Sequence, residues 1–215
     1  MKERIKETVK RYHKDIDFRN DVSFLVSTLT SLFFALFNLG MGILYQSVWN
    51  YSICIYYVLL FAVRILLSVS RKKNMDEKKV RTVFLISHIF LLLMAVALSG
   101  PILLMIAGER DFKYGMIPAI TIAAYTTYRL VFGIIRYKAS KKSDSLLEKS
   151  LWTVNLQDCL VSVLALQNSL IIATGKAMAE MKSLTIYTST GIWILILIIT
   201  IASFLQFRKK KKDSD

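Results

Sequence analysis

The stretch Leu184–Phe207, LTIYTSTGIWILILIITIASFLQF, contains no Asp, Glu, Lys or Arg and is followed directly by the basic run Arg208–Lys212. A helix needs about 20 mostly apolar residues to cross roughly 30 Å of hydrocarbon. The stretch is long enough and apolar enough, and it therefore predicts a transmembrane helix. The basic residues that follow it mark the membrane surface at which this helix ends.

Five further segments of the 215-residue chain have the same length and character. With the first stretch they predict an all-α membrane protein with six transmembrane helices. The five segments are Val22–Gln46, Tyr51–Ser70, Thr82–Ala107, Gly115–Arg136 and Leu151–Thr174. The third of them contains Ser99-Gly100-Pro101, which predicts a kink or an early exit from the membrane.

The composition excludes several other classes of protein. The chain is 54% hydrophobic and 20% charged, with 2 Pro, 8 Gly and 2 Cys. These values argue against a disordered chain, a collagen, a disulfide scaffold and a β-rich module.

We divide the chain into a basic N-terminal segment (residues 1–21), a transmembrane domain (22–207) and a basic tail (208–215). The N-terminal segment is too polar for a signal peptide, so we expect the first span to be retained.

The net charge of +14 comes from 29 Lys and Arg residues against 15 Asp and Glu. With six spans, 23 of the basic residues fall on one side, in residues 1–21, 71–81, 136–149 and 208–212. The opposite loops hold only four. The positive-inside rule therefore predicts that both termini are cytoplasmic. We expect a multi-pass protein of the cell membrane. Because this charge lies at helix ends, it indicates contact with the lipid bilayer and argues against nucleic-acid binding.

The sequence contains no motif typical of an enzyme. The two histidines, His13 and His88, do not form a His-Glu-x-x-His motif, and no glycines have phosphate-loop spacing. No serine lies in a Gly-x-Ser-x-Gly turn. Cys54 and Cys159 lie in separate spans and form no Cys-x-x-Cys pair. We therefore expect a protein that is not an enzyme.

Three charged residues and one histidine lie inside the predicted spans, at Arg64, Arg129, Asp158 and His88. Charged side chains are costly in a bilayer and mark functional sites by default. Counted along their helices, all four lie roughly 10 Å beneath the cytoplasmic surface. Asp158 is the only carboxylate in any predicted span and needs a partner there. For the two arginines, the alternative is that they extend to the cytoplasmic interface.

The fifth span is the most polar of the six. One helical face carries polar or small residues at a spacing of three or four, namely Asn155, Asp158, Ser162, Ala165 and Ser169. This face either lines a polar pathway or packs against neighbouring helices through interhelical hydrogen bonds. The first interpretation makes a set of polar residues candidates for a transport site: Asp158, Arg64, Arg129, His88, Asn155 and Ser162.

Two segments of the chain resemble the cation diffusion facilitator family. Ser143–Ser162, SDSLLEKSLWTVNLQDCLVS, is similar to the start of that family's fifth span, including the spacing from Ser145 to Asp158. Gly42–Ser47, GILYQS, resembles the end of the family's first span. The six spans, cytoplasmic termini and short outer loops agree with the same family.

The resemblance implies a divalent-cation site, usually for Zn²⁺ or Mn²⁺, formed by four side chains of the second and fifth spans. The matching positions in this chain are Tyr56, Leu60, Val154 and Asp158. Only Asp158 carries a side chain suited to such a cation, so a degenerate metal site is expected. Because the family often forms dimers, the resemblance also implies a homodimer.

In that register, Arg64 lies one turn from Leu60 on the same helical face. We therefore expect its guanidinium group to pair with Asp158 in place of a metal ion, with Arg129 as the rival partner. The functional hypothesis is a facilitator-like transporter of an ion or small solute. The alternative is a non-transporting membrane scaffold or partner subunit.

Overall fold

The computed structural model describes residues 16–72, 76–107, 115–140, 145–174 and 178–212. Most of the predicted N-terminal segment, residues 1–15, lies outside the described residues. Within the described ranges every element is a helix, and six helical units are long and apolar enough to cross a membrane. The prediction of an all-α protein with six spans is therefore confirmed.

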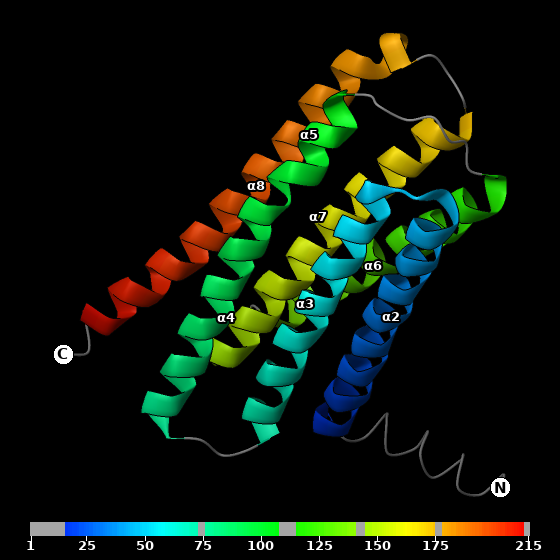
Figure 1. The fold of residues 1–215 in the computed structure, drawn as a ribbon. Helices are drawn as coiled ribbons and strands as arrows, with labels where there is room; N and C mark the ends of the chain where they lie inside the picture. Colours follow the sequence, from blue (N-terminus) through cyan, green and yellow to red (C-terminus); the bar gives the residue numbers. More distant parts are fainter. Residues whose placement is uncertain (1–15, 73–75, 108–114, 141–144, 175–177, 213–215) are drawn as a thin grey trace, which may run out of the picture.

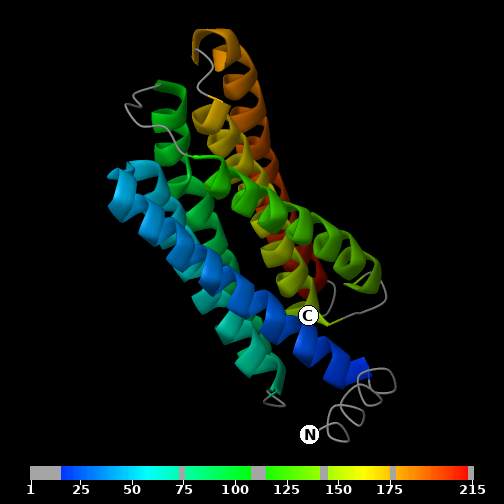
Figure 2. The same ribbon diagram turned by 90° about the vertical axis from the view of Figure 1, so that its right-hand side faces the viewer.

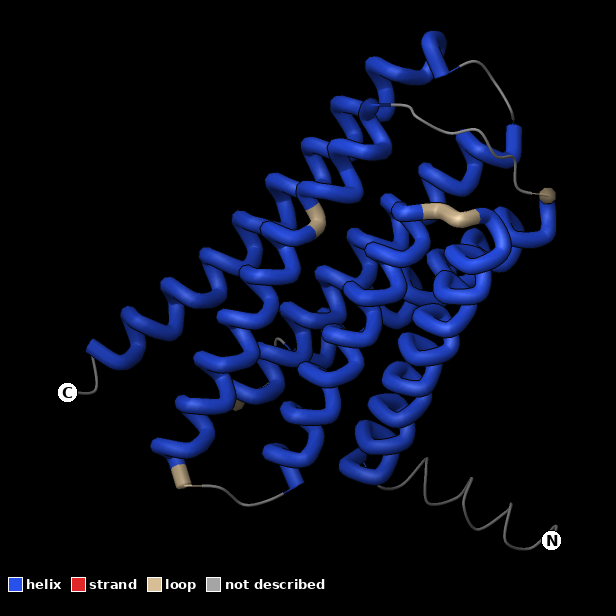
Figure 3. Tube along the Cα trace, viewed as in Figure 1, coloured by secondary structure: helices blue, strands red, loops and turns tan. Residues whose placement is uncertain are grey.

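Each predicted span corresponds to one rod of the bundle (Figure 1). The helices are α2 (Ile16–Tyr45), α3 (Val48–Lys72), α4 (Glu77–Ala97), α5 (Ser99–Ala107), α6 (Met116–Ser140), α7 (Leu146–Thr174) and α8 (Met178–Lys212). Helices α4 and α5 together form the third span, and the tube in Figure 3 shows the short break between them. Several helices extend beyond the predicted apolar segments into the flanking polar residues.

The break between α4 and α5 lies at Leu98, beside the predicted kink. Pro101 has no N–H group, so it cannot donate a helical hydrogen bond to the carbonyl of Ala97. Helix α8 supplies a donor nearby, because Nε1 of Trp193 donates to the carbonyl of Ala95 at 2.8 Å. The indole thus satisfies a backbone acceptor at a place where hydrocarbon offers no donor.

Helix α7 is the centre of the bundle, and Figures 1 and 2 show it enclosed by neighbouring helices. It packs against α3, α4, α6 and α8, while α2 packs mainly against α3. Of the six spans, α7 is the most buried and α8 the least. Because α7 is enclosed by protein, its polar side chains can bond to other helices instead of facing lipid.

The start of α2 and the end of α8 lie at the same end of the bundle (Figure 1). Large apolar side chains such as Phe33, Ile55, Ile117 and Ile198 are exposed on the outer faces of the helices. Exposed apolar faces of this kind are compatible with a surrounding bilayer. The side of the membrane on which the termini lie remains a prediction from the basic residues.

A buried arginine–aspartate cluster as candidate functional site

Three charged side chains from three helices meet inside the bundle: Arg64 on α3, Arg129 on α6 and Asp158 on α7. Nη2 of Arg64 lies 2.7 Å from Oδ2 of Asp158, and Nε of Arg129 lies 3.0 Å from the same oxygen. The side chains are 1%, 3% and 0% exposed, respectively. Both predicted partners therefore pair with Asp158 at once, and neither arginine extends to the interface. We call these three residues the arginine–aspartate cluster.

The two guanidinium groups also share three oxygen atoms of α2. Nη1 of Arg64 donates to the carbonyl and Oγ of Ser27, both at 2.8 Å, and to Oγ of Ser31 at 2.7 Å. Arg129 donates to the same Ser27 Oγ at 2.7 Å, to the Ser27 carbonyl at 2.9 Å and to Ser31 Oγ. Ser27 and Ser31 lie one helical turn apart, so both face the cluster from α2.

Asn155 and Tyr125 complete the hydrogen bonds around the cluster. Oδ1 of Asn155 accepts a hydrogen bond from Nη2 of Arg64 at 2.9 Å. The hydroxyl of Tyr125 donates to Oδ1 of Asp158 at 3.2 Å and accepts from Nε of Arg129 at 2.8 Å. Both carboxylate oxygens of Asp158 are therefore bonded, and Asn155, a candidate from the sequence, contacts the cluster through Arg64.

The arginine–aspartate cluster carries a net charge of +1, because two guanidinium groups face one carboxylate. Ser27, Ser31, Asn155 and Tyr125 surround it with neutral oxygen atoms. Neutral dipoles stabilise a buried charge but do not cancel it. A charge without a counter-charge at membrane depth is costly, and such charges are rare in transmembrane segments.

Several buried polar atoms near or beyond the cluster have no hydrogen-bond partner within the described ranges. They include Nε of Arg64, Oη of Tyr57, both amide atoms of Asn168 and Oγ of Ser169. Buried polar groups in proteins are nearly always bonded to protein or to ordered water. A bound water or solute is therefore the simplest partner for these atoms.

Two predicted candidates lie apart from the cluster. The ring of His88 contacts the carbonyl of Phe84 at 3.0 Å and Oγ of Ser203 on α8 at 2.9 Å. The structure therefore does not bring His88 into contact with the charged residues, because its ring faces α8. Oγ of Ser162 donates to its own helix, and its carbonyl accepts a 2.9 Å hydrogen bond from Thr126 on α6. At Ser162 the interhelical packing interpretation holds.

Helix α7 also carries polar groups on the side that faces α8. Nε2 of Gln157 donates to Oγ1 of Thr200 at 2.5 Å, and Nε2 of Gln167 donates to Oγ1 of Thr188 at 2.6 Å. The polar residues of α7 thus serve two interfaces, one with the cluster and one with α8. Gln157 and Gln167 therefore lie outside the helical face that carries Asn155, Asp158 and Ser162.

The four positions that match the facilitator metal ligands do not fit a divalent cation. Leu60 and Val154 are fully buried and carry no ligand atom, while both oxygens of Asp158 are already bonded. Tyr56 contributes one hydroxyl. In the described part of the chain no three His, Cys, Asp or Glu side chains group as a metal site. We therefore derive no step through a metal ion.

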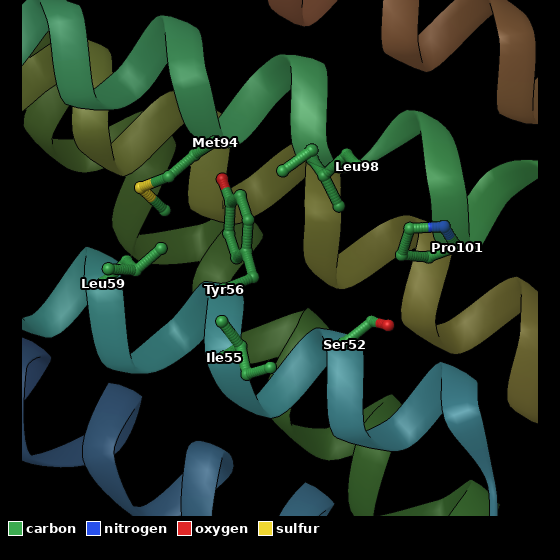
Figure 4. A pocket seen from close by; sticks show the side chains of 8 residues that line it. Ser52, Ile55, Tyr56, Leu59, Met94, Leu98 and Pro101 are labelled. Atoms are coloured by element: carbon green, nitrogen blue, oxygen red, sulfur yellow. The ribbon is translucent and has the colours of Figure 1, made fainter.

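A cavity of about 170 Å³ lies between α3 and the break that separates α4 from α5. Figure 4 shows its lining residues, which are Ser52, Ile55, Tyr56, Leu59, Met94, Ala97, Leu98 and Pro101. Tyr56 points across it from α3 toward α4 (Figure 4), and its buried hydroxyl has no partner among the described residues. The cavity is mainly apolar and lies about 12 Å along α3 from Arg64, so it is separate from the cluster.

Sequence reasoning did not identify Ser27, Ser31 or Tyr125 as part of the site. The available signal was a pair of polar residues one turn apart within an apolar span, as in Ser27 and Ser31 or Tyr125 and Arg129. That spacing places two groups on one helical face, but it does not say which helix the face meets.

No family model matches the chain, and neither a curated protein nor a solved structure matches it. The resemblance of two segments to cation diffusion facilitators therefore stays an expectation from the sequence. The functional argument that follows depends on the geometry of the cluster.

Proposed function

We propose that this chain is a membrane transport protein that binds a small ionic solute at the arginine–aspartate cluster. The observation that carries the proposal is the burial of three ionisable side chains within transmembrane helices. Such residues are costly there, and they commonly mark the pathways of ions and solutes. A purely structural ion pair needs one arginine for one aspartate, whereas this cluster contains two.

The polar groups of α7 support a route that continues beyond the cluster. Asn168 lies ten residues from Asp158, or about 15 Å along the helix. Both amide atoms of Asn168 and Oγ of the adjacent Ser169 lack partners among the described residues. Ser169 shares the face of α7 that carries Asp158, so a hydrated solute that moves along that face would find hydrogen-bonding groups at both depths.

Helix α2 is the element whose movement would open the cluster. It contacts the two guanidinium groups through the neutral oxygens of Ser27 and Ser31. The salt bridges instead join Arg64 and Arg129 to Asp158 on α7. Separation of α2 would break these hydrogen bonds and the packing of Phe34 against Tyr57 on α3, but it would leave both ion pairs intact.

A second candidate function is a non-transporting scaffold or partner subunit. It is favoured by the way Arg64, Arg129 and Tyr125 enclose Asp158, since all these contacts come from the chain itself. A closed network of this kind fixes the packing of neighbouring helices. For either function, we propose the cell membrane as the location, with the basic ends of the helices on the cytoplasmic side.

Flux measurements in proteoliposomes test the proposal. The solutes are Zn²⁺ and Mn²⁺, suggested by the family resemblance, and potassium chloride, nitrate and formate with valinomycin for charge balance. The variants are Arg129→Gln and the matched control Arg81→Gln, whose side chain pairs with the exposed Glu77 one turn away. Both variants are first checked for a single monodisperse species in detergent.

We expect flux of at least one solute above that of empty vesicles, abolished by Arg129→Gln and retained by Arg81→Gln. Absence of flux for every solute would overturn the proposal and favour the scaffold. Undiminished flux in a well-folded Arg129→Gln protein would also overturn it, because transport would then bypass the cluster. If Arg129→Gln does not fold, Arg64→Gln replaces it in the same comparison, because it removes the other arginine of the cluster.

A further inference from the structure

We infer that the arginine–aspartate cluster is a binding site for a small monovalent anion, which sits between the Arg64 and Arg129 guanidinium groups and competes with Asp158 for them. The inference deepens the proposed transport function by naming the class of solute. Binding can be measured without transport, so the two ideas can fail separately.

Charge balance is the first step of the argument. The three side chains carry a net charge of +1 at 0% to 3% exposure. A bound cation would raise this charge, and a dianion would reverse its sign. A monovalent anion brings the site to neutrality, which is the least costly state for a buried site in hydrocarbon. A water molecule would leave the charge unchanged.

The hydrogen-bond inventory is the second step. Each guanidinium group has five N–H donors and no acceptor. Arg64 and Arg129 together direct their donors at the same three α2 oxygens, so Ser27 and Ser31 each accept from both arginines. Asn155, Asp158 and Tyr125 also accept from these groups, yet Nε of Arg64 still has no acceptor among the described residues. An anion contributes acceptors only, which is the component that the site lacks.

The third step concerns Nε of Arg64. Its Nε is buried and has no hydrogen-bond partner in the described part of the chain. Guanidinium groups bind planar oxyanions through two parallel N–H donors. A planar ion of the size of formate or nitrate is the shape that such an edge recognises. Nη2, which carries the N–H parallel to that of Nε, is bonded to Asp158 and Asn155, so an anion at this edge would compete with both of them for Nη2.

Competition with Asp158 gives the inference its most specific consequence. Oδ2 of Asp158 lies within 3.0 Å of nitrogen atoms from both arginines, where an incoming anion would also bind. Asp158→Asn removes this internal competitor and raises the net charge of the site to +2. Anion binding should therefore become tighter, whereas a cation site would lose affinity with the same substitution.

The test measures binding to the purified full chain in detergent. Sodium formate and sodium nitrate are titrated at constant ionic strength against sodium gluconate, whose anion is too large to be enclosed. The thermal unfolding midpoint and isothermal titration calorimetry report binding, since a ligand of the folded state raises the midpoint in a saturable way. The variants change the charge of the site: Asp158→Asn to +2, Arg129→Gln to zero, and the double variant back to +1.

We expect saturable binding of formate or nitrate to the parent and affinity roughly tenfold higher in Asp158→Asn. Arg129→Gln should lose binding, and Arg129→Gln/Asp158→Asn should recover part of it, because affinity follows net charge. The control Arg81→Gln should bind as the parent does, since its ion pair is remote and exposed. If Arg129→Gln does not fold, the comparison of parent, Asp158→Asn and the double variant still decides.

Three results would overturn the inference: no saturable anion effect in the parent, equal binding by Arg129→Gln, or weaker binding by Asp158→Asn. Anion binding without flux would contradict the transport function and leave the anion site standing. Flux of Zn²⁺ or Mn²⁺ without anion binding would leave transport standing and remove the anion site.

Discussion

Arg64 and Arg129 belong to different helices but donate to the same three oxygen atoms of α2, on Ser27 and Ser31. This sharing brings two like charges side by side, where Asp158 is their only carboxylate partner among the described residues. The arrangement ties α2, α3, α6 and α7 together at one point. Changes at this point should therefore affect both the stability and the ligand preference of the protein.

Replacement of Asp158 by Asn should destabilise the fold when no small anion is present. Two buried guanidinium groups would lose the carboxylate that pairs with both, and removal of one partner of a buried ion pair costs about 3–5 kcal/mol. Unfolding in a detergent titration measures the change. The control Glu77→Gln breaks the exposed pair with Arg81 and should cost less than about 1 kcal/mol. Equal stability of Asp158→Asn and parent would contradict the pairing.

Replacement of Ser31 by Ala should also destabilise the protein. The substitution removes an acceptor shared by Arg64 and Arg129, and a hydrogen bond to a charged group contributes about 1.5–3 kcal/mol. The control is Ser52→Ala, because Oγ of Ser52 donates only to a carbonyl of its own helix. If the unfolding midpoint shifts equally in the two variants, the hydrogen bonds from the two arginines to Ser31 do not contribute to stability.

Adjacent threonines on α6 allow a test of interhelical hydrogen bonding. Oγ1 of Thr126 donates to the carbonyl of Ser162 on α7, whereas Oγ1 of the exposed Thr127 donates within its own helix. Thr126→Val should therefore cost about 0.6–1.7 kcal/mol, the range for such bonds in membranes. Thr127→Val should leave the unfolding free energy nearly unchanged. A larger loss of unfolding free energy in Thr127→Val than in Thr126→Val would contradict this arrangement of α6 against α7.

Gly133 allows close approach of α6 to α7. A Cβ atom at this position would lie 2.6 Å from Sγ of Cys159, so Gly133→Ala should overpack the interface and cost about 1–3 kcal/mol. Gly191→Ala is the matched control, because nothing lies within 4 Å of a Cβ at that position. The second substitution Cys159→Ala should restore stability to Gly133→Ala. Failure of that rescue in unfolding measurements would exclude the proposed steric contact.

Membrane topology can be tested with fusions at two places. Green fluorescent protein at the C-terminus should fluoresce, and alkaline phosphatase at the same place should be inactive, because the positive-inside rule predicts a cytoplasmic end. Alkaline phosphatase fused within residues 108–114 should be active in a bacterial host. An active C-terminal phosphatase fusion would invert the predicted orientation.

The number and positions of the spans followed from the sequence because a transmembrane helix satisfies its own backbone hydrogen bonds. A sufficient apolar length is then enough to predict each one. The break beside Pro101 could also be predicted from the sequence, because the missing N–H is a property of proline itself. The sequence also identified Arg64, Arg129 and Asp158, because charges are conspicuous in apolar segments.

The contacts of these residues were decided by tertiary structure. The sequence left Arg64 and Arg129 as rivals, but both reach Asp158, and Arg64 does so across 94 positions of the chain. It also grouped His88 with them, although the packing of α4 against α8 directs that ring to Ser203.

For Ser27 and Ser31, too, the sequence determined one property and the tertiary structure determined another. Their spacing determined that they share one helical face, while their role as acceptors for two arginines depended on how α2 is rotated against α3 and α6. The sequence alone therefore determined which segments cross the membrane and which charges they carry. Only the tertiary structure decided which faces meet, because helix rotation is set by side-chain packing between segments distant in the chain.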